Sequence, residues 1–228
     1  DKHKAAACLA LADCEWKMGQ YSWALENYQA AVHSYLHIQD NLNIARCYSG
    51  MGIIAAETEE LQRALECFEH AMRYHSSVKK SQFTVVVTGN IGHTYLKLQR
   101  FEEAMHCFEH ALAEHTEFGN QEGMANMLGG IAGVHVLRKE YDKGLEHLAK
   151  VKELRKSEEP GRGMAVTMMN TGITLLRMGK FQEAKHELKQ ARSLMEAIDL
   201  KTYEPEVLKH LMHVNLELGN TAEFDKYL

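Results

Sequence analysis

Apolar residues that recur every forty positions are the feature that most constrains the fold of this chain. They stand at five of six equivalent places, and a bulky residue follows seven positions after each. A fixed period of roughly 20–50 residues indicates a solenoid, whose units bury their apolar faces by stacking on their neighbours. The six places are Tyr21, Leu61, Phe101, Tyr141, Phe181 and Thr221, and the bulky residues are Tyr28, Phe68, Phe108, Leu148, Leu188 and Leu228.

Each forty-residue repeat is predicted to be two antiparallel helices joined by a tight turn. In the fifth repeat, apolar residues follow the spacing of one helix face over 164–178 and again over 181–195. Gly179 lies between them, and glycine readily ends a helix in the left-handed conformation. The sequence therefore predicts an all-α solenoid, a single domain over 1–228. Its repeats are expected near 4–40, 44–80, 84–120, 124–160, 164–200 and, incomplete, 204–228.

Small residues recur on both helices of the predicted pair. We expect them to let the two helices of a repeat approach closely, while the bulky residue fills the space between consecutive repeats. The small residues of the first helix are Ala12, Gly52, Gly92, Ala132 and Gly172, and those of the second are Ala24, Ala64, Ala104, Gly144 and Ala184.

A small residue late in the first helix, an aromatic residue opening the second, and then alanine, a ring and alanine form one pattern. The third repeat shows it most fully, in Gly92, Tyr95, Phe101, Ala104, Phe108 and Ala111, and the fifth shows it in Gly172, Phe181, Ala184 and Ala191. This pattern resembles the tetratricopeptide repeat and covers essentially the whole chain. The usual repeat has about 34 residues. The forty-residue form is similar to repeats of polarity adaptors that couple heterotrimeric G proteins to spindle machinery.

The resemblance implies a right-handed superhelix whose first helices line a concave groove. It also implies a non-enzymatic scaffold that binds a peptide or amphipathic helix of a partner protein in that groove. An architectural role in a cytoskeletal or ciliary type of assembly, through the convex face and the ends, is the alternative. The expected groove residues are Asp13, Trp16, Arg46, Ser49, Ile53, Val86, Gly89, His93, Asn126, Gly129, Gly133, Val166, Met169, Ile173 and Arg177.

Charge and hydropathy argue against two classes of partner. The net charge is −5 and the basic residues are dispersed, so we expect no nucleic-acid binding. No apolar run approaches the roughly 18–20 residues of a membrane helix, so we expect no membrane insertion. Five cysteines without a CxxC motif favour buried thiols and a cytoplasmic, reducing compartment.

Histidines and cysteines raise the question of a metal site. Cys67 with His70, and Cys107 with His110, share a helix face at equivalent places of neighbouring repeats. Duplication alone would reproduce these pairs, and stacked repeats lie about 10 Å apart, too far for one ion. We therefore expect no metal, no cofactor and no enzyme activity, since no catalytic motif is visible either.

The ends of the chain lead to a further expectation. It begins without a methionine and stops inside a predicted helix, which favours a fragment of a longer protein. An incomplete sixth repeat would leave an apolar face open. Either more repeats follow, or this end associates with another copy.

Overall fold

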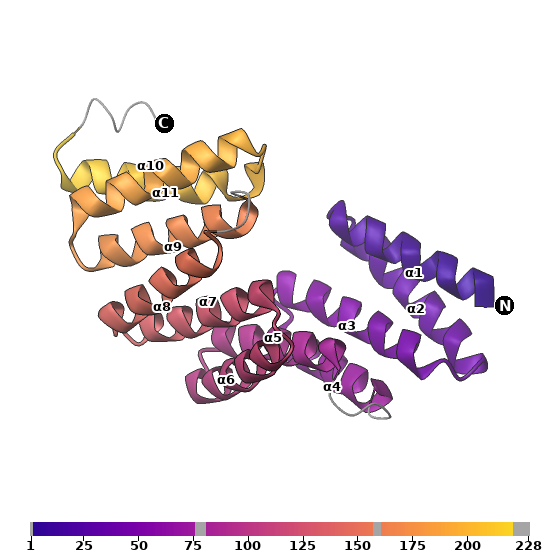
Figure 1. Ribbon diagram of the computed structural model, residues 1–228. Helices are drawn as coiled ribbons and strands as arrows, with labels where there is room; N and C mark the ends of the chain where they lie inside the picture. The colour runs from indigo at the N-terminus through magenta and orange to yellow at the C-terminus, as the bar shows by residue number, and fades with distance from the viewer. Residues whose placement is uncertain (1, 76–80, 157–160, 221–228) are drawn as a thin grey trace. The chain divides into compact units, whose positions relative to one another are not determined.

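The computed structural model describes residues 2–75, 81–156 and 161–220, and within these ranges every regular element is a helix (Figure 1). The predicted all-α array of helix pairs is confirmed. The first helices of the pairs, called A helices here, are α1 (Lys2–Lys17), α3 (Asn41–Glu57), α5 (Gln82–Lys97), α7 (Gln121–Leu137), α9 (Arg162–Arg177) and α11 (Glu204–Glu217). The second, or B, helices are α2 (Tyr21–His37), α4 (Leu61–His75), α6 (Phe101–Glu117), α8 (Tyr141–Leu154) and α10 (Phe181–Ala197), and a 3₁₀ turn, η1 (Lys201–Tyr203), precedes α11.

The turns repeat every twenty residues, half the period of the sequence. At each described turn one residue is left-handed, and the next residue donates its N–H to the carbonyl five positions earlier, as Asp40 does to Tyr35 (N–O 3.1 Å). This bond is the one that closes a Schellman motif, and it satisfies a carbonyl that the helix end leaves unpaired. The left-handed residues are Gly19, Gln39, Glu59, Gln99, Gly119, Lys139, Gly179, Asp199 and Gly219.

The B helices start where the forty-residue spacing predicts. The five described ones begin at Tyr21, Leu61, Phe101, Tyr141 and Phe181. The side chain seven residues later is buried in all five of these helices. Thr221 and Leu228, the predicted sixth pair, lie outside the described residues.

The recurring glycines face these buried side chains, which corrects the expected packing. A Cβ built on Gly52 would lie 2.6 Å from Cε1 of Phe68, and one built on Gly172 would lie 2.7 Å from Cγ of Leu188. The bulky residue thus packs onto the A helix of its own repeat, whereas we expected it to lie between consecutive repeats. The reason is steric: the missing Cβ makes room for a ring or branched side chain, and at Gly172 the Ala184 backbone also approaches, with its carbonyl oxygen 3.2 Å from the built Cβ. Tyr28 also reaches Gly50 of the next repeat, as expected.

A different position fills the junction between consecutive repeats. It lies fourteen residues into the B helix and is His75 in α4. The buried His75 ring packs on Phe83 of α5 with ring centroids 4.6 Å apart. Its Nε2 lies 2.6 Å from Oγ of Ser81, the residue that caps α5. One side chain therefore joins the end of one repeat to the start of the next.

The next two junctions use the same position with a glycine as partner. Arg155 Nη1 donates to the Gly163 carbonyl (N–O 2.8 Å), and a Cβ on Gly163 would lie 2.8 Å from the guanidinium carbon. His115 lies in the same way against Gly123, where a Cβ would overlap the imidazole. At all three junctions the residue eight positions later is the contact partner, a ring for His75 and a glycine for His115 and Arg155.

The chain divides into two compact units, 1–114 and 115–228, called the N-terminal and C-terminal units here. In the N-terminal unit, a core cluster around α1 to α3 includes Tyr28, Tyr35 and Ile44. In the C-terminal unit, a cluster around α9 to α11 includes Leu188 and Leu211. Each core is built between helices that follow one another in the chain, as stacked repeats require. That the whole chain forms one continuous solenoid stays a prediction.

A histidine pair links α7 to α8 inside the C-terminal unit. The rings of His135 and His147 stack with centroids 5.4 Å apart, and His135 Nδ1 lies 2.8 Å from Glu140 Oε2. His147 Nδ1 is buried and has no hydrogen-bond partner among the described residues. Burial, then Lys150 and then His135, lowers the pKa of His147.

We expect this histidine to make the C-terminal unit less stable in acid. The unfolded chain binds a proton on His147 at a higher pH than the folded chain does, so stability falls as pH drops below about 6.5. His147→Gln should reduce the dependence of the unfolding free energy on pH, measured by urea denaturation near pH 7.5 and 5.5. His186→Gln, on the exposed face of α10, is the control and should leave the dependence unchanged. An equal slope in wild type and His147→Gln would contradict the assignment.

Candidate protein-binding surfaces

The predicted groove residues all lie on A helices, in five of the six described ones. In the N-terminal unit, Ile53 and His93 meet at a hollow between α3, α4 and α5. Phe68 and Thr94 contribute to its floor, and Glu57 and Lys97 to its rim. The His93 ring meets the edge of Phe108 with centroids 4.8 Å apart. Partial desolvation, and then Lys97, lowers the pKa of His93, although part of the side chain stays exposed.

Other predicted groove residues of the N-terminal unit are bound to side chains of the same unit. The Trp16 indole donates to Glu57 (Nε1–Oε2 2.9 Å), which joins α1 to α3. Asp13 accepts from the Tyr28 hydroxyl (Oδ1–O 2.7 Å) and lies 3.9 Å from the Arg46 guanidinium. Asp13, Trp16 and Arg46 therefore already have partners within the chain, and a ligand would have to share or displace these contacts.

In the C-terminal unit, predicted groove residues line one hollow that is open to solvent. A hollow of about 240 Å³ lies between α7, α8, α9 and α11. Gly129 and Gly133 of α7 line it together with Ile173 and Arg177 of α9. A Cβ on Gly129 would meet no atom within 4 Å, so this glycine borders open space. Sequence reasoning missed Asn170, Glu206 and His210, which also line the hollow.

His210 lies at this hollow on α11. Burial is the first cause of its lowered pKa, and Glu206 opposes the shift while Lys209, His213 and Arg177 add to it. The imidazole is therefore held in its neutral form more firmly than in a free histidine. It presents one donor and one acceptor nitrogen to a ligand. Aligned with the fifth repeat, His210 is equivalent to Asn170, one position after the predicted groove residue Met169, so the predicted helix face missed both lining residues by one position.

Three predicted groove residues are not available to a partner. The Ser49 and Met169 side chains are buried, and Gly89 is buried as well. Met169 is only 3 % exposed and belongs to the core cluster of the C-terminal unit. Sequence reasoning placed these residues one helical turn apart from exposed ones and could not tell which side of the stripe faces the neighbouring helix. Val86, in contrast, is 49 % exposed.

Asn126 and Val166 lie at the amino ends of α7 and α9. The Asn126 side-chain oxygen accepts from Arg155 Nη2 (2.6 Å), and Arg155 also donates to Thr167 Oγ1 (2.7 Å). Asn126 is thus tied to the junction between the fourth and fifth repeats, with its amide N–H₂ still able to donate. Val166 is half-buried beside the core.

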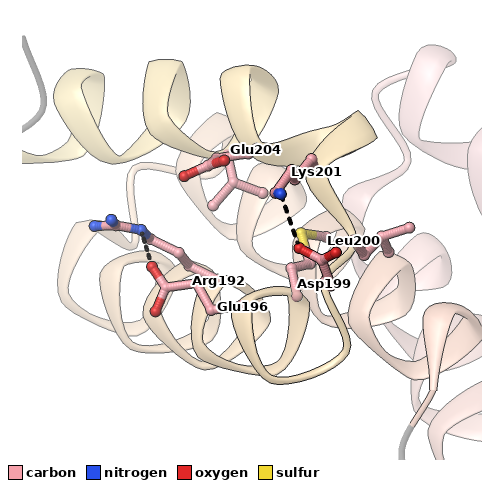
Figure 2. A pocket seen from close by; sticks show the side chains of 8 residues that line it. Arg192, Glu196, Asp199, Leu200, Lys201 and Glu204 are labelled. Atoms are coloured by element: carbon pink, nitrogen blue, oxygen red, sulfur yellow. Dashed lines mark ion pairs between the residues drawn. The ribbon is translucent and has the colours of Figure 1, made fainter.

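A second hollow of the C-terminal unit lies between α10 and α11, at η1 (Figure 2). Its floor includes the buried Met195 and Val207. Figure 2 shows two ion pairs at its rim, Arg192 with Glu196 (2.9 Å) and Lys201 with Asp199 (3.1 Å). Glu204 lines the hollow as well, so its lining carries one more negative than positive charge. It was not predicted from the sequence.

The repeats of this chain match a known family. The family model described as the tetratricopeptide repeat matches residues 44–117 and 123–197, more than half of the chain. The chain belongs to the tetratricopeptide repeat family. The resemblance to the tetratricopeptide repeat inferred from the sequence is therefore confirmed, and the similarity of the forty-residue form to polarity adaptors stays a prediction. No curated protein matches the sequence.

Solved structures similar to this tetratricopeptide repeat chain share its fold. A Rap protein complexed with competence and sporulation factor superimposes with a TM-score of 0.80 at 18% identity, over 91% of this chain and 56% of the Rap chain. The Rap conjugation gene regulator of plasmid pLS20, in complex with the Phr* peptide, gives 0.77 at 17% identity, over 92% and 57%. BtubC from P. vanneervenii gives 0.72 at 13% identity, over 90% and 86%. This chain therefore spans little more than half of each Rap protein.

The thiols of the tetratricopeptide repeats are free, and two of them belong to the Cys–His pairs considered above. Burial raises the pKa of both Cys67 and Cys107. A raised pKa disfavours the thiolate, which is the form that binds metal. No helix in the described ranges combines the length and the apolar character that crossing a membrane requires.

Proposed function

We propose that this chain is a non-enzymatic scaffold that binds a peptide or amphipathic helix of a partner protein along its A helices. The observation that carries the proposal is the hollow of the C-terminal unit, where Gly129 of α7 borders open space and Gly133 and Ile173 line the same hollow. A cavity lined mainly by apolar atoms with a few convergent polar groups is the usual form of a binding site. An apolar side chain of the partner would occupy this space.

The rim of this hollow suggests how the partner is oriented. Arg177 is exposed and carries a fixed positive charge, while Asn170 and His210 offer hydrogen-bonding groups. A backbone carbonyl or other acceptor next to the partner's apolar anchor would meet them, and Glu206 at the same hollow would accept from a donor of the partner. The N-terminal unit offers fewer polar groups to a partner, because Asp13, Trp16 and Arg46 already contact other side chains.

The comparisons support the class of partner without naming it. One structurally similar Rap protein is complexed with competence and sporulation factor, and another with the Phr* peptide. Helix pairs that stack in this way leave their A helices free to line a continuous surface for such a ligand. We infer the same use of the A helices here.

Filling the hollow at Gly129 tests the proposal with little risk to the fold. Peptides would be selected from a random library on the wild-type chain, and their Kd measured by fluorescence polarisation. Gly129→Phe should weaken binding by about tenfold or more, since the ring occupies the space of the anchor. Gly129→Ala adds one methyl group and is the matched control, expected to bind within about twofold of wild type. Ile173→Glu should also weaken binding.

The alternative, an architectural role, draws on a different surface. Trp23 of α2 is 64 % exposed, and Leu36, Ile38 and Leu42 are exposed around the turn that follows α2. Such side chains favour a second contact surface. If Gly129→Phe and Ile173→Glu retain full binding while Trp23→Ser abolishes it, the A-helix proposal is wrong and the architectural role stands.

A further inference from the structure

Two histidines on the exposed surface of α2 lie with one ring nitrogen of each close to the other. His33 and His37 are four residues apart, and their Nε2 atoms are 3.2 Å from each other. The rings meet edge to face, with centroids 4.7 Å apart and an interplanar angle of 87°. Both side chains are exposed, so an ion could reach the nitrogens from solvent. None of the predicted groove residues is involved.

The distance between the nitrogens fits two ligands on one metal ion. Imidazole nitrogens bind zinc at about 2.0–2.1 Å, so an ion equidistant from the two Nε2 atoms would subtend an angle of about 100°. That angle lies between the right angle of an octahedral site and the tetrahedral angle. Spacing of four residues places both rings on one helix face, as in helical zinc motifs with two histidines.

A hydrogen bond between the rings accounts for the same distance in the metal-free chain. Such a bond requires one ring to carry its proton on Nε2 and the other to accept there. Metal binding requires both Nε2 lone pairs, so the donor ring shifts its proton to Nδ1, with no net release from a neutral pair. Both rings are exposed, and water can hydrogen-bond to Nδ1. The contact in the metal-free chain thus holds the nitrogens at chelating distance.

The charges on α2 do not oppose a cation. The helix contains neither lysine nor arginine, and Glu26 is its only acidic residue. The pair also does not recur at equivalent positions of other repeats, unlike the Cys–His pairs of α4 and α6. The residues forty, eighty, 120 and 160 positions after His33 are Arg73, Ala113, Glu153 and Ser193, and those after His37 are Ser77, Glu117, Ser157 and Ala197.

We propose that His33 and His37 form a bidentate site for a divalent transition metal ion. Imidazole suits Zn²⁺, Ni²⁺ and Cu²⁺, and Cu²⁺ binds most tightly to a given nitrogen site. No group of three or more His, Cys, Asp or Glu side chains in the described part of the chain is arranged to hold a metal. The remaining positions on the ion are therefore open to water, or to a side chain of a partner protein.

A second histidine pair with the same spacing provides a matched control. His106 and His110 are also four residues apart on one exposed face of α6. There, however, His110 Nδ1 faces Glu114 Oε2 at 3.7 Å. A metal ion at His110 Nδ1 would compete with this contact, whereas the Nε2 atoms of His33 and His37 already lie 3.2 Å apart.

Copper titration of the full chain tests the proposal. Cu²⁺ would be added to the wild type, to His33→Asn/His37→Asn and to His106→Asn/His110→Asn, with binding followed by calorimetry. We expect His33→Asn/His37→Asn to lose the most tightly bound equivalent of Cu²⁺, with an affinity about tenfold or more below that of the wild type. His106→Asn/His110→Asn should retain this tight equivalent. Because both rings are exposed, neither variant should change the helical circular dichroism.

Electron paramagnetic resonance of the first equivalent of Cu²⁺ on the wild type gives an answer that does not depend on a variant. Nitrogen hyperfine coupling from two imidazoles is expected, and acidification should release the ion because protonated imidazole cannot coordinate it. Coupling to one nitrogen, or equal tight binding by His33→Asn/His37→Asn, would overturn the proposal. Loss of the tight equivalent only in His106→Asn/His110→Asn would overturn it as well.

Discussion

Replacing Phe68 by alanine is expected to destabilise the N-terminal unit by about 3–5 kcal/mol. The ring is 1 % exposed and packs directly on the Gly52 backbone, with Ala55, Ala64 and Val87 in the same cluster. Its removal leaves a cavity beside a glycine, which has no side chain to move into the space. Urea denaturation followed by circular dichroism measures the loss.

Phe118→Ala is the matched control for this experiment, since it removes the same ring from a side chain that is 42 % exposed. A change within about 0.5 kcal/mol is expected there. If Phe68→Ala cost no more than Phe118→Ala, the ring would not be holding α3 against α4, and the packing described for the repeats would be wrong.

Gly52→Ala is expected to destabilise the chain although alanine is the better helix former. Alanine in place of a helical glycine contributes about 1 kcal/mol. The new methyl group would lie 2.6 Å from the Phe68 ring, however, and overpacking of this kind costs about 1–3 kcal/mol. Gly129→Ala adds the same methyl group where nothing lies within 4 Å, so it should stabilise by about 0.5–1 kcal/mol. Thermal unfolding of the two variants therefore moves in opposite directions.

A second substitution should rescue the first. The fourth repeat has Ala132 and Leu148 at the two places that Gly52 and Phe68 occupy in the second. Both of those side chains are buried, so this combination packs without a glycine. Gly52→Ala/Phe68→Leu is accordingly expected to lose less unfolding free energy than the two single variants lose in sum. A double-mutant cycle measures the difference. A strictly additive cycle would show that the methyl group and the ring do not meet.

The sequence predicts the helix pairs well because the residues that recur every forty positions are those that start and bury the B helices. Tyr21, Leu61, Phe101, Tyr141 and Phe181 mark the B helix starts, since a bulky residue there recurs with the buried residue seven positions later. Turns are harder to predict. Glycine indicates the left-handed residue at Gly179, but five of the nine described turns place another residue there, such as Gln39 or Lys139. The Schellman hydrogen bonds stabilise those turns whatever the side chain, so composition gives no signal.

The candidate site is predictable only to the level of the helix face. Gly129, Gly133, Ile173 and Arg177 come together in one hollow, as their shared helical spacing predicts. Met169 follows the same spacing and is nevertheless buried, because α9 packs against helices on two sides and its apolar stripe is wider than the exposed groove. Which edge of a stripe remains open depends on how far each neighbouring helix is rotated, and that is set by contacts between repeats that no single repeat contains.

The contacts at the junctions between repeats limit which repeat can follow another. Arg155 fits because Gly163 follows it, and His75 packs on Phe83. A rearranged chain that placed the repeat containing Phe83 after Arg155 would bring a ring against a guanidinium where only a glycine now fits. The repeats are therefore not freely interchangeable, because a repeat that follows Arg155 needs a small residue where Gly163 stands, even if every helix still forms.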